Sequence, residues 1–322
     1  MITLLWRTDL HISDKAPRSR TDDWRGTLLG KLRQVGALAK KHKADAVLDG
    51  GDIFDTKSPF RNSHEMVRAI ADVQAKYPCP TFSCVGNHDC VYGDYSFIDR
   101  QPLGVLFSTG VFQRLYDNHE AVFIDHKGVK VRVVGVPYHG AEYDMDRIWG
   151  IQKKDENYLV VVAHLLASRA GGTMFQGEDI IKYGDLKDHP ASIFAFGHWH
   201  KDQGVYEYAP GKFAVNVGSL SRGALIEDNV ERSPSIARLR FTKESCEIDQ
   251  IPLEVAPATE VFDIEARVRT ESRTSMMDSF IDRIQEALST QDKASLIEII
   301  RGMPEIPEVV REKAYLYLEK TA

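Results

Sequence analysis

Carboxylate, imidazole and amide side chains follow apolar, strand-like runs at five points in the chain. These side chains belong to Asp9, His11, Asp52, Asn87, His88, His164, His198 and His200. A mixture of nitrogen and oxygen donors is typical of Mn²⁺, Fe²⁺ or Zn²⁺ sites, because Ca²⁺ and Mg²⁺ prefer shells of oxygen alone. One carboxylate reached from two sides bridges two ions about 3.5–4 Å apart, the arrangement that hydrolyses phosphoesters. The residue types therefore indicate a two-metal centre for phosphoester chemistry.

Parallel strands are needed to bring these residues to one edge of a sheet. Apolar runs predict strands over 2–6, 46–48, 80–85, 158–163 and 192–196, and helical spacing of apolar residues predicts helices over 24–41 and 66–77. Strands that alternate with helices at this spacing form parallel βαβ units, whose ligands bind at the carboxyl ends of the strands. Hairpins are predicted from 121–124 to 129–136 and from 205–208 to 213–217, and further strands over 235–241 and 246–251.

Composition sets few limits on function. The 322 residues are 43% apolar and 27% charged, as is usual for a globular protein, and the formal charge is −6. That charge disfavours a general nucleic-acid coat, although metal sites are themselves built from carboxylates. No apolar run reaches the roughly 18 residues of a membrane span, and the first residues do not resemble a signal peptide. Four cysteines without CxxC spacing indicate free thiols, so we expect a cytoplasmic protein, in a bacterial cell or in the host if phage-encoded.

The pattern changes along the chain and predicts four segments. We expect a catalytic core over 1–215, a β-rich element over 216–255 that completes the sheet or caps it, a linker over 256–273 and a helical region over 274–322. Met277, Phe280, Ile281, Ile284 and Leu288 give the first terminal helix an apolar stripe, and further helices follow at 296–300 and 307–319. This stripe either packs on its own domain or docks onto a partner protein.

Five ordered motifs resemble those of the calcineurin-like metallophosphoesterases. They are Asp9-Leu10-His11, Gly51-Asp52, Gly86-Asn87-His88-Asp89, His164 and Gly197-His198-Trp199-His200. The resemblance covers about residues 1–250 and implies a four-layer α/β/β/α fold, an α/β sandwich, with a small β-rich cap region and a C-terminal helical appendage. Within this superfamily, the run from Gly51 to Pro59 resembles the DNA-repair nucleases of the SbcD/Mre11 family, and Gly218-Ser219-Leu220 fits the same branch.

The resemblance also implies a role for each motif residue. One ion would be held by Asp9, His11, Asp52 and His200, and the other by Asp52, Asn87, His164 and His198, with Asp52 bridging. His88 would face the scissile phosphate and protonate the leaving oxygen, Asp89 would orient His88, and Asp55 would support the site from outside the ligand shell. Thr8 stands where relatives commonly have Ser, and Asp55 stands where archaeal and eukaryotic relatives often have His.

The implied protein is a DNA exo- or endonuclease subunit that uses two Mn²⁺ ions, with Mg²⁺, Fe²⁺ or Zn²⁺ as alternatives. It would act with an SbcC/Rad50-like ATPase in DNA end processing, repair or recombination. The C-terminal helices would dock that ATPase. Early helices and the aromatic loop 92–107 would form the surface of a homodimer. Arg18, Arg20, Lys57 and Arg61 either contact phosphates or lie in a solvated loop. Ser219 is expected to be a turn residue beside the site.

Two other functions remain open from the sequence. The first is a stand-alone phosphatase or cyclic-nucleotide phosphodiesterase of the same superfamily, which an active site closed to polymers would favour. The second is a non-catalytic scaffold that metal ions stabilise and that recruits a partner. The presence of Asn87 and His88 speaks against the scaffold, because a structural site has no need of a histidine that is not a ligand.

Overall fold

Alternating side chains in the first strand explain why two sheets pack face to face. In the computed structural model, β1 (Ile2–Arg7) turns Ile2, Leu4 and Trp6 into a core between the sheets, whereas Leu5 faces a layer of helices. A strand of the second sheet, β7 (Tyr158–Ala163), does the same with Val160 and Val162. These interior strands are therefore apolar on both faces, which is typical of a sandwich covered on its outer sides.

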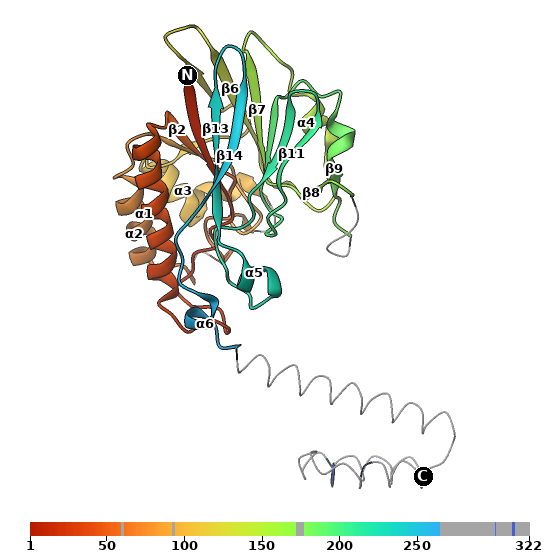
Figure 1. Cartoon of the computed structure of the whole chain (residues 1–322). Coiled ribbons are helices and arrows are strands. Elements are labelled where there is room, and N and C mark those ends of the chain that lie inside the picture. Colours follow the sequence, from red (N-terminus) through yellow and green to blue (C-terminus); the bar gives the residue numbers. More distant parts are fainter. Residues whose placement is uncertain (59–60, 92–93, 172–176, 265–299, 301–310, 313–322) are drawn as a thin grey trace, which may run out of the picture. The chain divides into compact units, whose positions relative to one another are not determined.

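Each sheet has six strands among the residues that the structure describes. The first has the order β14-β13-β1-β2-β3-β4, and its other strands are β2 (Ala46–Asp49), β3 (Thr81–Ser83), β4 (Gln113–Arg114), β13 (Ser235–Phe241) and β14 (Cys246–Pro252). The second has the order β11-β12-β10-β7-β6-β5, with β5 (Glu120–Ile124), β6 (Lys130–Val136), β10 (Ile193–Phe196), β11 (Gly204–Ala209) and β12 (Lys212–Asn216). A small parallel pair is formed by β8 (Ala167–Ser168) and β9 (Ile181–Lys182). Figure 1 shows the two sheets side by side.

Helices cover the outer face of each sheet. The first sheet carries α1 (Trp24–His42), α2 (His64–Gln74), the 3₁₀ helix η3 (Tyr95–Arg100) and α3 (Pro102–Ser108). The second carries α4 (Met145–Trp149) and η4 (Tyr183–Leu186). Two further short helices, α5 (Glu227–Glu231) and α6 (Ala258–Val261), follow β12 and β14 in the chain. The result is a mixed α/β fold with the four layers α/β/β/α, which confirms the predicted fold class.

The carboxyl ends of the parallel strands converge on one edge of the sandwich. β1, β2 and β3 run parallel in the first sheet, and β6, β7, β10 and β12 run parallel in the second. The backbone N–H of Tyr138, just after β6, donates to the carbonyl oxygen of Val85, just after β3, at 3.0 Å. This bond joins the ends of the two sheets, so residues that follow strands of either sheet lie close together.

Most of the predicted elements are confirmed, and the differences have local causes. The helix over 24–41, both hairpins and the strands over 235–241 and 246–251 are present, with β13 pairing antiparallel to β1. The run 80–85 forms a strand only over Thr81–Ser83, because the chain then turns toward the second sheet. The predicted aromatic loop 92–107 is wrong in part, since η3 and most of α3 lie within it. Pro102 at the first turn of α3 was the available signal for that helix.

The structure describes residues 1–58, 61–91, 94–171, 177–264, 300 and 311–312. Met1–Phe262 forms one compact unit and Asp263–Ala322 a second. The predicted terminal helices, the end of the linker and the docking surface for an ATPase lie almost wholly outside the described residues. Among the residues described, no helix is long and apolar enough to cross a membrane, and all four cysteines are free.

Candidate metal centre

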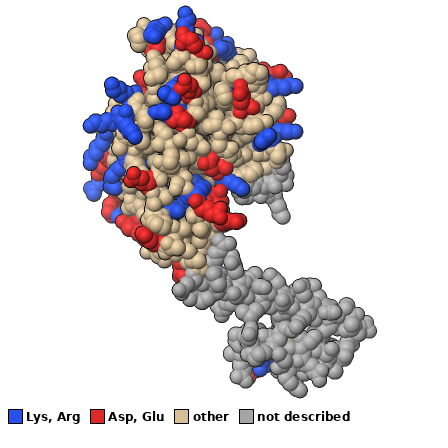
Figure 2. All heavy atoms as spheres, in the orientation of Figure 1, with Lys and Arg blue, Asp and Glu red and all other residues tan. Residues whose placement is uncertain are grey.

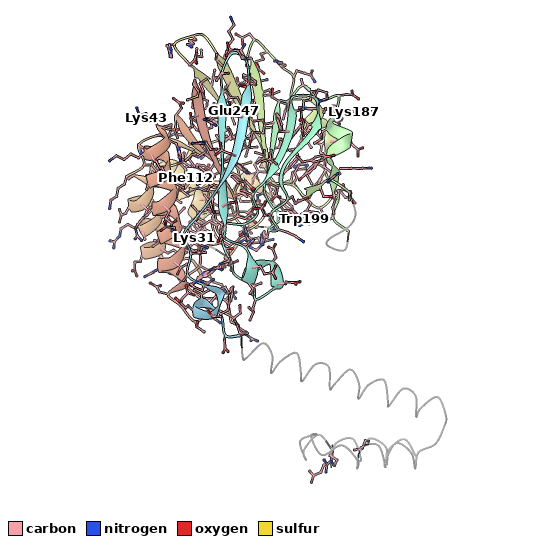
Figure 3. All side chains as sticks on the ribbon, viewed as in Figure 1. Lys31, Lys43, Phe112, Lys187, Trp199 and Glu247 are labelled. Atoms are coloured by element: carbon pink, nitrogen blue, oxygen red, sulfur yellow. The ribbon has the colours of Figure 1, made fainter. Side chains whose placement is uncertain are left out.

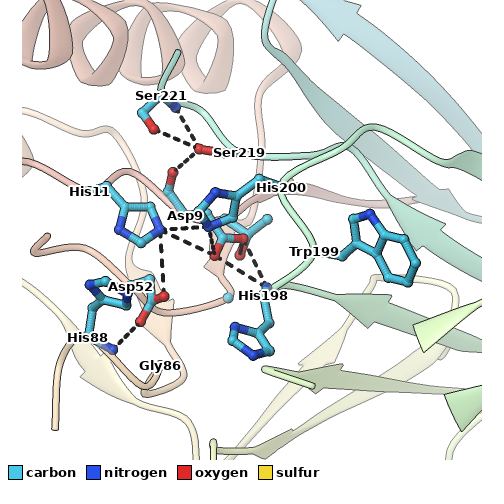
Figure 4. Close-up of polar contacts among 12 residues, drawn as sticks. Asp9, His11, Asp52, Gly86, His88, His198, Trp199, His200, Ser219 and Ser221 are labelled. Atoms are coloured by element: carbon cyan, nitrogen blue, oxygen red, sulfur yellow. Dashed lines mark hydrogen bonds and ion pairs between the residues drawn. The ribbon is translucent and has the colours of Figure 1, made fainter. Parts of the chain in front are cut away.

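The first predicted set of ligands meets at the ends of β1, β2 and β10. The side chains of Asp9, His11, Asp52 and His200 each offer a donor atom to one small volume. Nε2 of His11 lies 2.9 Å from Nε2 of His200 and 3.5 Å from Oδ2 of Asp52, and Nε2 of His200 lies 3.7 Å from Oδ1 of Asp9. Figure 4 shows these four side chains pointing toward one another. Donor atoms gathered this closely can bind one cation together.

The second predicted set shares Asp52 with the first. Asp52, His164 and His198 offer donor atoms to a second small volume. Nε2 of His164 lies 3.3 Å from Oδ2 of Asp52 and 3.2 Å from Oδ1 of Asn87. Nδ1 of the same ring lies 2.8 Å from the carbonyl oxygen of Gly50. Because that carbonyl can only accept, Nδ1 donates to it, and Nε2 is the ring nitrogen that faces Asp52 and Asn87 and that could bind an ion.

One oxygen atom decides whether these residues fit a pair of metal ions. Oδ2 of Asp52 is buried and lacks a hydrogen-bond partner among the described residues, while histidine nitrogens of both sets approach it from two sides. A buried carboxylate oxygen without a hydrogen bond is costly unless a cation occupies the space beside it. The donors are imidazole nitrogens, carboxylates and one amide oxygen, which suit Mn²⁺, Fe²⁺ or Zn²⁺. The residues present therefore fit two ions that share Asp52.

The backbone at the site is held in an unusual conformation. Asp9, His11, Asp52 and His198 have φ angles of 55°, 49°, 52° and 79°, in the left-handed region that non-glycine residues seldom adopt. Gly86 packs directly against Asp52, so that a Cβ atom at position 86 would overlap Oδ1 and the backbone nitrogen of Asp52. Four ligand residues in a costly conformation indicate a backbone shaped to aim side chains rather than to extend a strand.

Asp89 holds the backbone beside the bridging aspartate. Its buried carboxylate accepts from the backbone N–H groups of Asp52 at 2.7 Å, Ile53 at 3.1 Å, Phe54 at 3.3 Å and Gly86 at 3.1 Å. Burial and the nearby charge of Asp52 raise the pKa of Asp89 to about 7. The hydrogen bonds found for the Asp89 carboxylate thus go to the loops that carry Asp52 and Gly86.

His88 takes its orientation from Asp55. Nδ1 of His88 lies 2.6 Å from the carbonyl oxygen of Asp55, to which it donates, so the ring presents Nε2 on its other side. The His88 ring stands edge-on to the ring of His11, with centroids 4.8 Å apart. The carboxylate of Asp55 lies 3.5 Å from Nδ1 of His11. Asp55 therefore contacts both histidines, with its backbone on one and its side chain on the other.

Burial and neighbouring charges shift the pKa values of the ligand histidines. Burial alone would lower the pKa of His11, but hydrogen bonds to Asp55 and Asp9 outweigh it and raise the pKa to about 10. Burial also acts to lower the pKa of His164. The charge of Asp52 outweighs burial and raises the pKa of His164 to about 9. For His200, burial and the neighbouring His11 lower the pKa to about 4. Without ions, protons on two histidines compensate the buried carboxylates.

A groove of about 1480 Å³ opens over the site. Its walls include His88, residues of both ligand sets and the basic side chains of Lys15, Arg18, Arg61 and Lys201. Of the basic residues singled out from the sequence, Arg18 and Arg61 face this groove, whereas Arg20 is buried and pairs with Asp22 at 2.7 Å. Lys57 is exposed and lies outside the lining. Both signs of charge are interspersed on the face of this unit shown in Figure 2.

The turn after β12 supports the first ligand set from behind. Oγ of Ser219 donates to the carbonyl oxygen of Asp9 at 2.7 Å and lies 2.8 Å from Oγ of Ser221. Lys31 points inward from α1 and donates from Nζ to the carbonyl oxygen of Leu220 at 2.6 Å (Figure 3). Ser219 is thus a turn residue beside the site.

Two residues at the site were missed by the sequence analysis. Oε1 of Glu178 lies 2.8 Å from Nε2 of His198 and 2.9 Å from Oη of Tyr143. Glu178 and Tyr143 belong to irregular stretches without periodicity, and neither stands in one of the five motifs. A tertiary contact brings them to the site, since the N–H of Asp179 donates to the carbonyl oxygen of Ala141 at 2.9 Å. Nothing in the local sequence signals that contact.

The sequence pattern of the calcineurin-like phosphoesterase family matches residues 3–202, the stretch that carries both ligand sets. The chain belongs to this family. Calcineurin-like phosphoesterases hydrolyse phosphoester bonds and depend on two metal ions, and the clustered donors described above are placed to bind them. No curated protein sequence matches the chain significantly.

Solved structures similar to the chain include one from Thermus thermophilus and one from Danio rerio. The protein TT1561 of Thermus thermophilus shares 15% identity over 77% of this chain and 98% of its own length, with a TM-score of 0.46. A dimetal phosphatase from Danio rerio shares 13% identity over 79% of this chain and 99% of its own, with a TM-score of 0.49.

Proposed function

We propose that this phosphoesterase is a DNA nuclease subunit of the SbcD/Mre11 type, cleaving phosphodiesters with Mn²⁺. The observation that carries the proposal is the groove. Its volume of about 1480 Å³ exceeds the roughly 300–1,000 Å³ of small-molecule pockets. Four basic side chains line it beside the acidic metal ligands, and basic side chains are the usual contacts to backbone phosphates. A groove of this volume favours a polymer over a small phosphate ester.

The proposed roles follow from the contacts of each residue. Asp9, His11, Asp52 and His200 would hold one ion, and Asp52, Asn87, His164 and His198 the other. When bound, two such ions lower the pKa of a water molecule and neutralise charge on the phosphoryl oxygens. In this reaction hydroxide derived from water would form a bond to phosphorus as the bond to the leaving oxygen breaks, and His88, fixed through Nδ1 by the Asp55 carbonyl, would donate a proton from Nε2 to that leaving oxygen. The products are an alcohol and a phosphate monoester.

The partners of the nuclease are also part of the proposal. We infer an SbcC/Rad50-like ATPase that binds the helical region 274–322 and presents DNA ends to the groove, and a homodimer of this chain. The support is the resemblance in the segment Gly51–Pro59 and the apolar stripe from Met277 to Leu288. Addition of such an ATPase with ATP should stimulate degradation of linear duplex DNA by the full chain. A rate that ATP and the ATPase leave unchanged would contradict the partnership.

The direct test of the nuclease is digestion of DNA with Mn²⁺. Linear duplex and single-stranded DNA are incubated with the full chain, beside a chromogenic phosphodiester. His88→Ala serves as the matched variant, because it leaves both ligand sets intact. We expect wild-type protein to degrade DNA, and His88→Ala to lose at least about 100-fold in rate, the usual contribution of a general acid, while binding the same two ions. Turnover of the small ester with DNA left intact, also in the presence of the ATPase, would support a phosphatase or cyclic-nucleotide phosphodiesterase instead.

A further inference from the structure

A carboxylate outside both ligand sets contacts one of the ligand histidines. Oε1 of Glu178 lies 2.8 Å from Nε2 of His198, and the Glu178 side chain is only 11% exposed although it lines the groove. An ionised carboxylate can only accept, so Nε2 of His198 donates this bond and carries the ring proton. The lone pair of the imidazole then lies on Nδ1.

Glu178 is itself held by a directed chain of hydrogen bonds. The backbone N–H of Leu166 donates to Oη of Tyr143 at 2.8 Å, which leaves the Tyr143 hydroxyl proton to donate to Oε1 of Glu178 at 2.9 Å. The next residue, Asp179, accepts from the backbone N–H of Tyr143 at 2.8 Å. Two stretches of chain therefore clamp the carboxylate in place before any ion is bound.

Three of the four candidate ligand histidines, His11, His164 and His198, each have a second contact, and these contacts differ. For His164 the carbonyl oxygen of Gly50 accepts a hydrogen bond from Nδ1, and for His11 the Asp55 carboxylate lies beside Nδ1. For His198 the contact is on Nε2 instead. A histidine that binds a metal through one nitrogen depends on the partner of the other nitrogen for its tautomer and its ring orientation.

We propose that Glu178, supported by Tyr143, is a positioning residue for the second ion of the site. It fixes His198 in the tautomer whose Nδ1 binds the ion that Asp52, Asn87 and His164 share, and it holds the plane of the ring. The inference rests on the two-metal site of the proposed function. Glu178 does not contact the ion, so its effect on the ion passes through His198.

The test is a calorimetric titration of the full chain with Mn²⁺, which requires no substrate. We compare wild type with Glu178→Ala, Glu178→Gln and the control Glu142→Gln, which makes the same charge change at an exposed residue next to Tyr143. We expect two ions in wild type and an affinity for one of them lowered about 10–100-fold in Glu178→Ala, the usual cost of losing such a partner. Glu178→Gln should lose less, because its amide oxygen still accepts from Nε2, and Glu142→Gln should match wild type.

Two results would overturn the inference. Unchanged affinity for both ions in a folded Glu178→Ala would show that His198 needs no partner, and equal, complete loss of one ion in Glu178→Gln and Glu178→Ala would make Glu178 a direct ligand. Tyr143→Phe provides a second variant if Glu178→Ala fails to fold, and should weaken the same ion by a smaller factor. Because the readout is metal binding, a wild type that binds two ions without cutting DNA contradicts the nuclease and leaves the role of Glu178 standing.

Discussion

At the scale of single residues, the site stores backbone strain to aim its ligands. Asp9, His11 and Asp52 take left-handed backbone conformations within a few residues after their strands, and Oδ2 of Asp52 is buried without a hydrogen bond among the residues described. Each feature costs stability in the metal-free protein. Both are accounted for if the ligands are held ready for two ions, because binding recovers the cost that folding incurs.

Proton release should accompany metal binding. The pKa values of His11 and His164 are raised to about 10 and 9 by neighbouring carboxylates that outweigh the opposing effect of burial. Both rings are therefore protonated at pH 7 in the metal-free protein, and we expect binding of the ions to release about two protons. Calorimetry in buffers of different ionisation enthalpy measures this number. A number near zero would contradict the charge balance inferred for the empty ligand sets.

The same shifts determine how stability depends on pH. His11 and His164 bind protons more tightly in the folded state than in the unfolded state, where the pKa is near 6.5. Their protonation therefore stabilises the fold, and this contribution is complete at pH values below about 6.5. This contribution is lost as the pH rises through about 9 and 10. Chemical denaturation of the metal-free protein should therefore show a falling free energy of unfolding across that range, and saturating Mn²⁺ should remove most of the dependence.

At the scale of elements, the turn after each strand matters more than the strand. The loop after β3 brings Gly86 against Asp52, and Asp89 then ties that loop to the one after β2 through backbone hydrogen bonds. The strands supply the parallel arrangement that places these turns together. Small changes in the turns are thus expected to affect the site strongly.

A pair of glycine variants separates close packing from general glycine effects. In Gly86→Ala the added methyl overlaps Asp52, so we expect a loss of about 1–3 kcal/mol in the free energy of unfolding and weaker binding of both ions. Gly30→Ala places a methyl in open space on α1 and should stabilise the protein by about 0.5–1 kcal/mol, with unchanged metal binding. Denaturant titration and calorimetry measure both effects. Equal behaviour of the two variants would contradict the packing of Gly86 on Asp52.

The elements, and the positions of the candidate ligands at strand ends, were largely predictable from the sequence, for a physical reason. Residues such as Asp9 and His164 stand directly after apolar runs, so local pattern alone puts them at strand ends. Glu178 could not be predicted, because a contact between two irregular loops brings it to His198. Likewise η3 and α3 are short and weakly periodic, and their packing on the first sheet decides their conformation.

At the scale of the whole molecule, the unit Met1–Phe262 presents one groove above the joined ends of two sheets. The total charge of −6 would repel DNA, so the proposed DNA binding would depend on where the basic side chains lie. Lys15, Arg18, Arg61 and Lys201 are the basic residues that line the groove. In the proposed nuclease these side chains would contact phosphates of a DNA strand that crosses the metal centre.

Truncation of groove arginines should affect polymers selectively. In Arg18→Ala combined with Arg61→Ala, we expect the KM for DNA to rise several-fold and the slope of log KM against log salt to fall by about 2, roughly one per lost phosphate contact. The KM for a small phosphodiester should not change, since both side chains lie outside the ligand sets. Arg33→Ala on α1, exposed and outside the groove lining, is the control. An equal rise for both substrates would contradict a groove that binds DNA.

The most direct test of the account is to count the ions that Asp52 holds. Asp52→Asn keeps the shape of the side chain but replaces one oxygen of the bridge with an amide nitrogen, which cannot bind a cation. Calorimetric titration with Mn²⁺ should show two ions in wild type and weakening of both together in the variant. Loss of one ion with the other unchanged, or retention of both, would contradict a centre that shares Asp52.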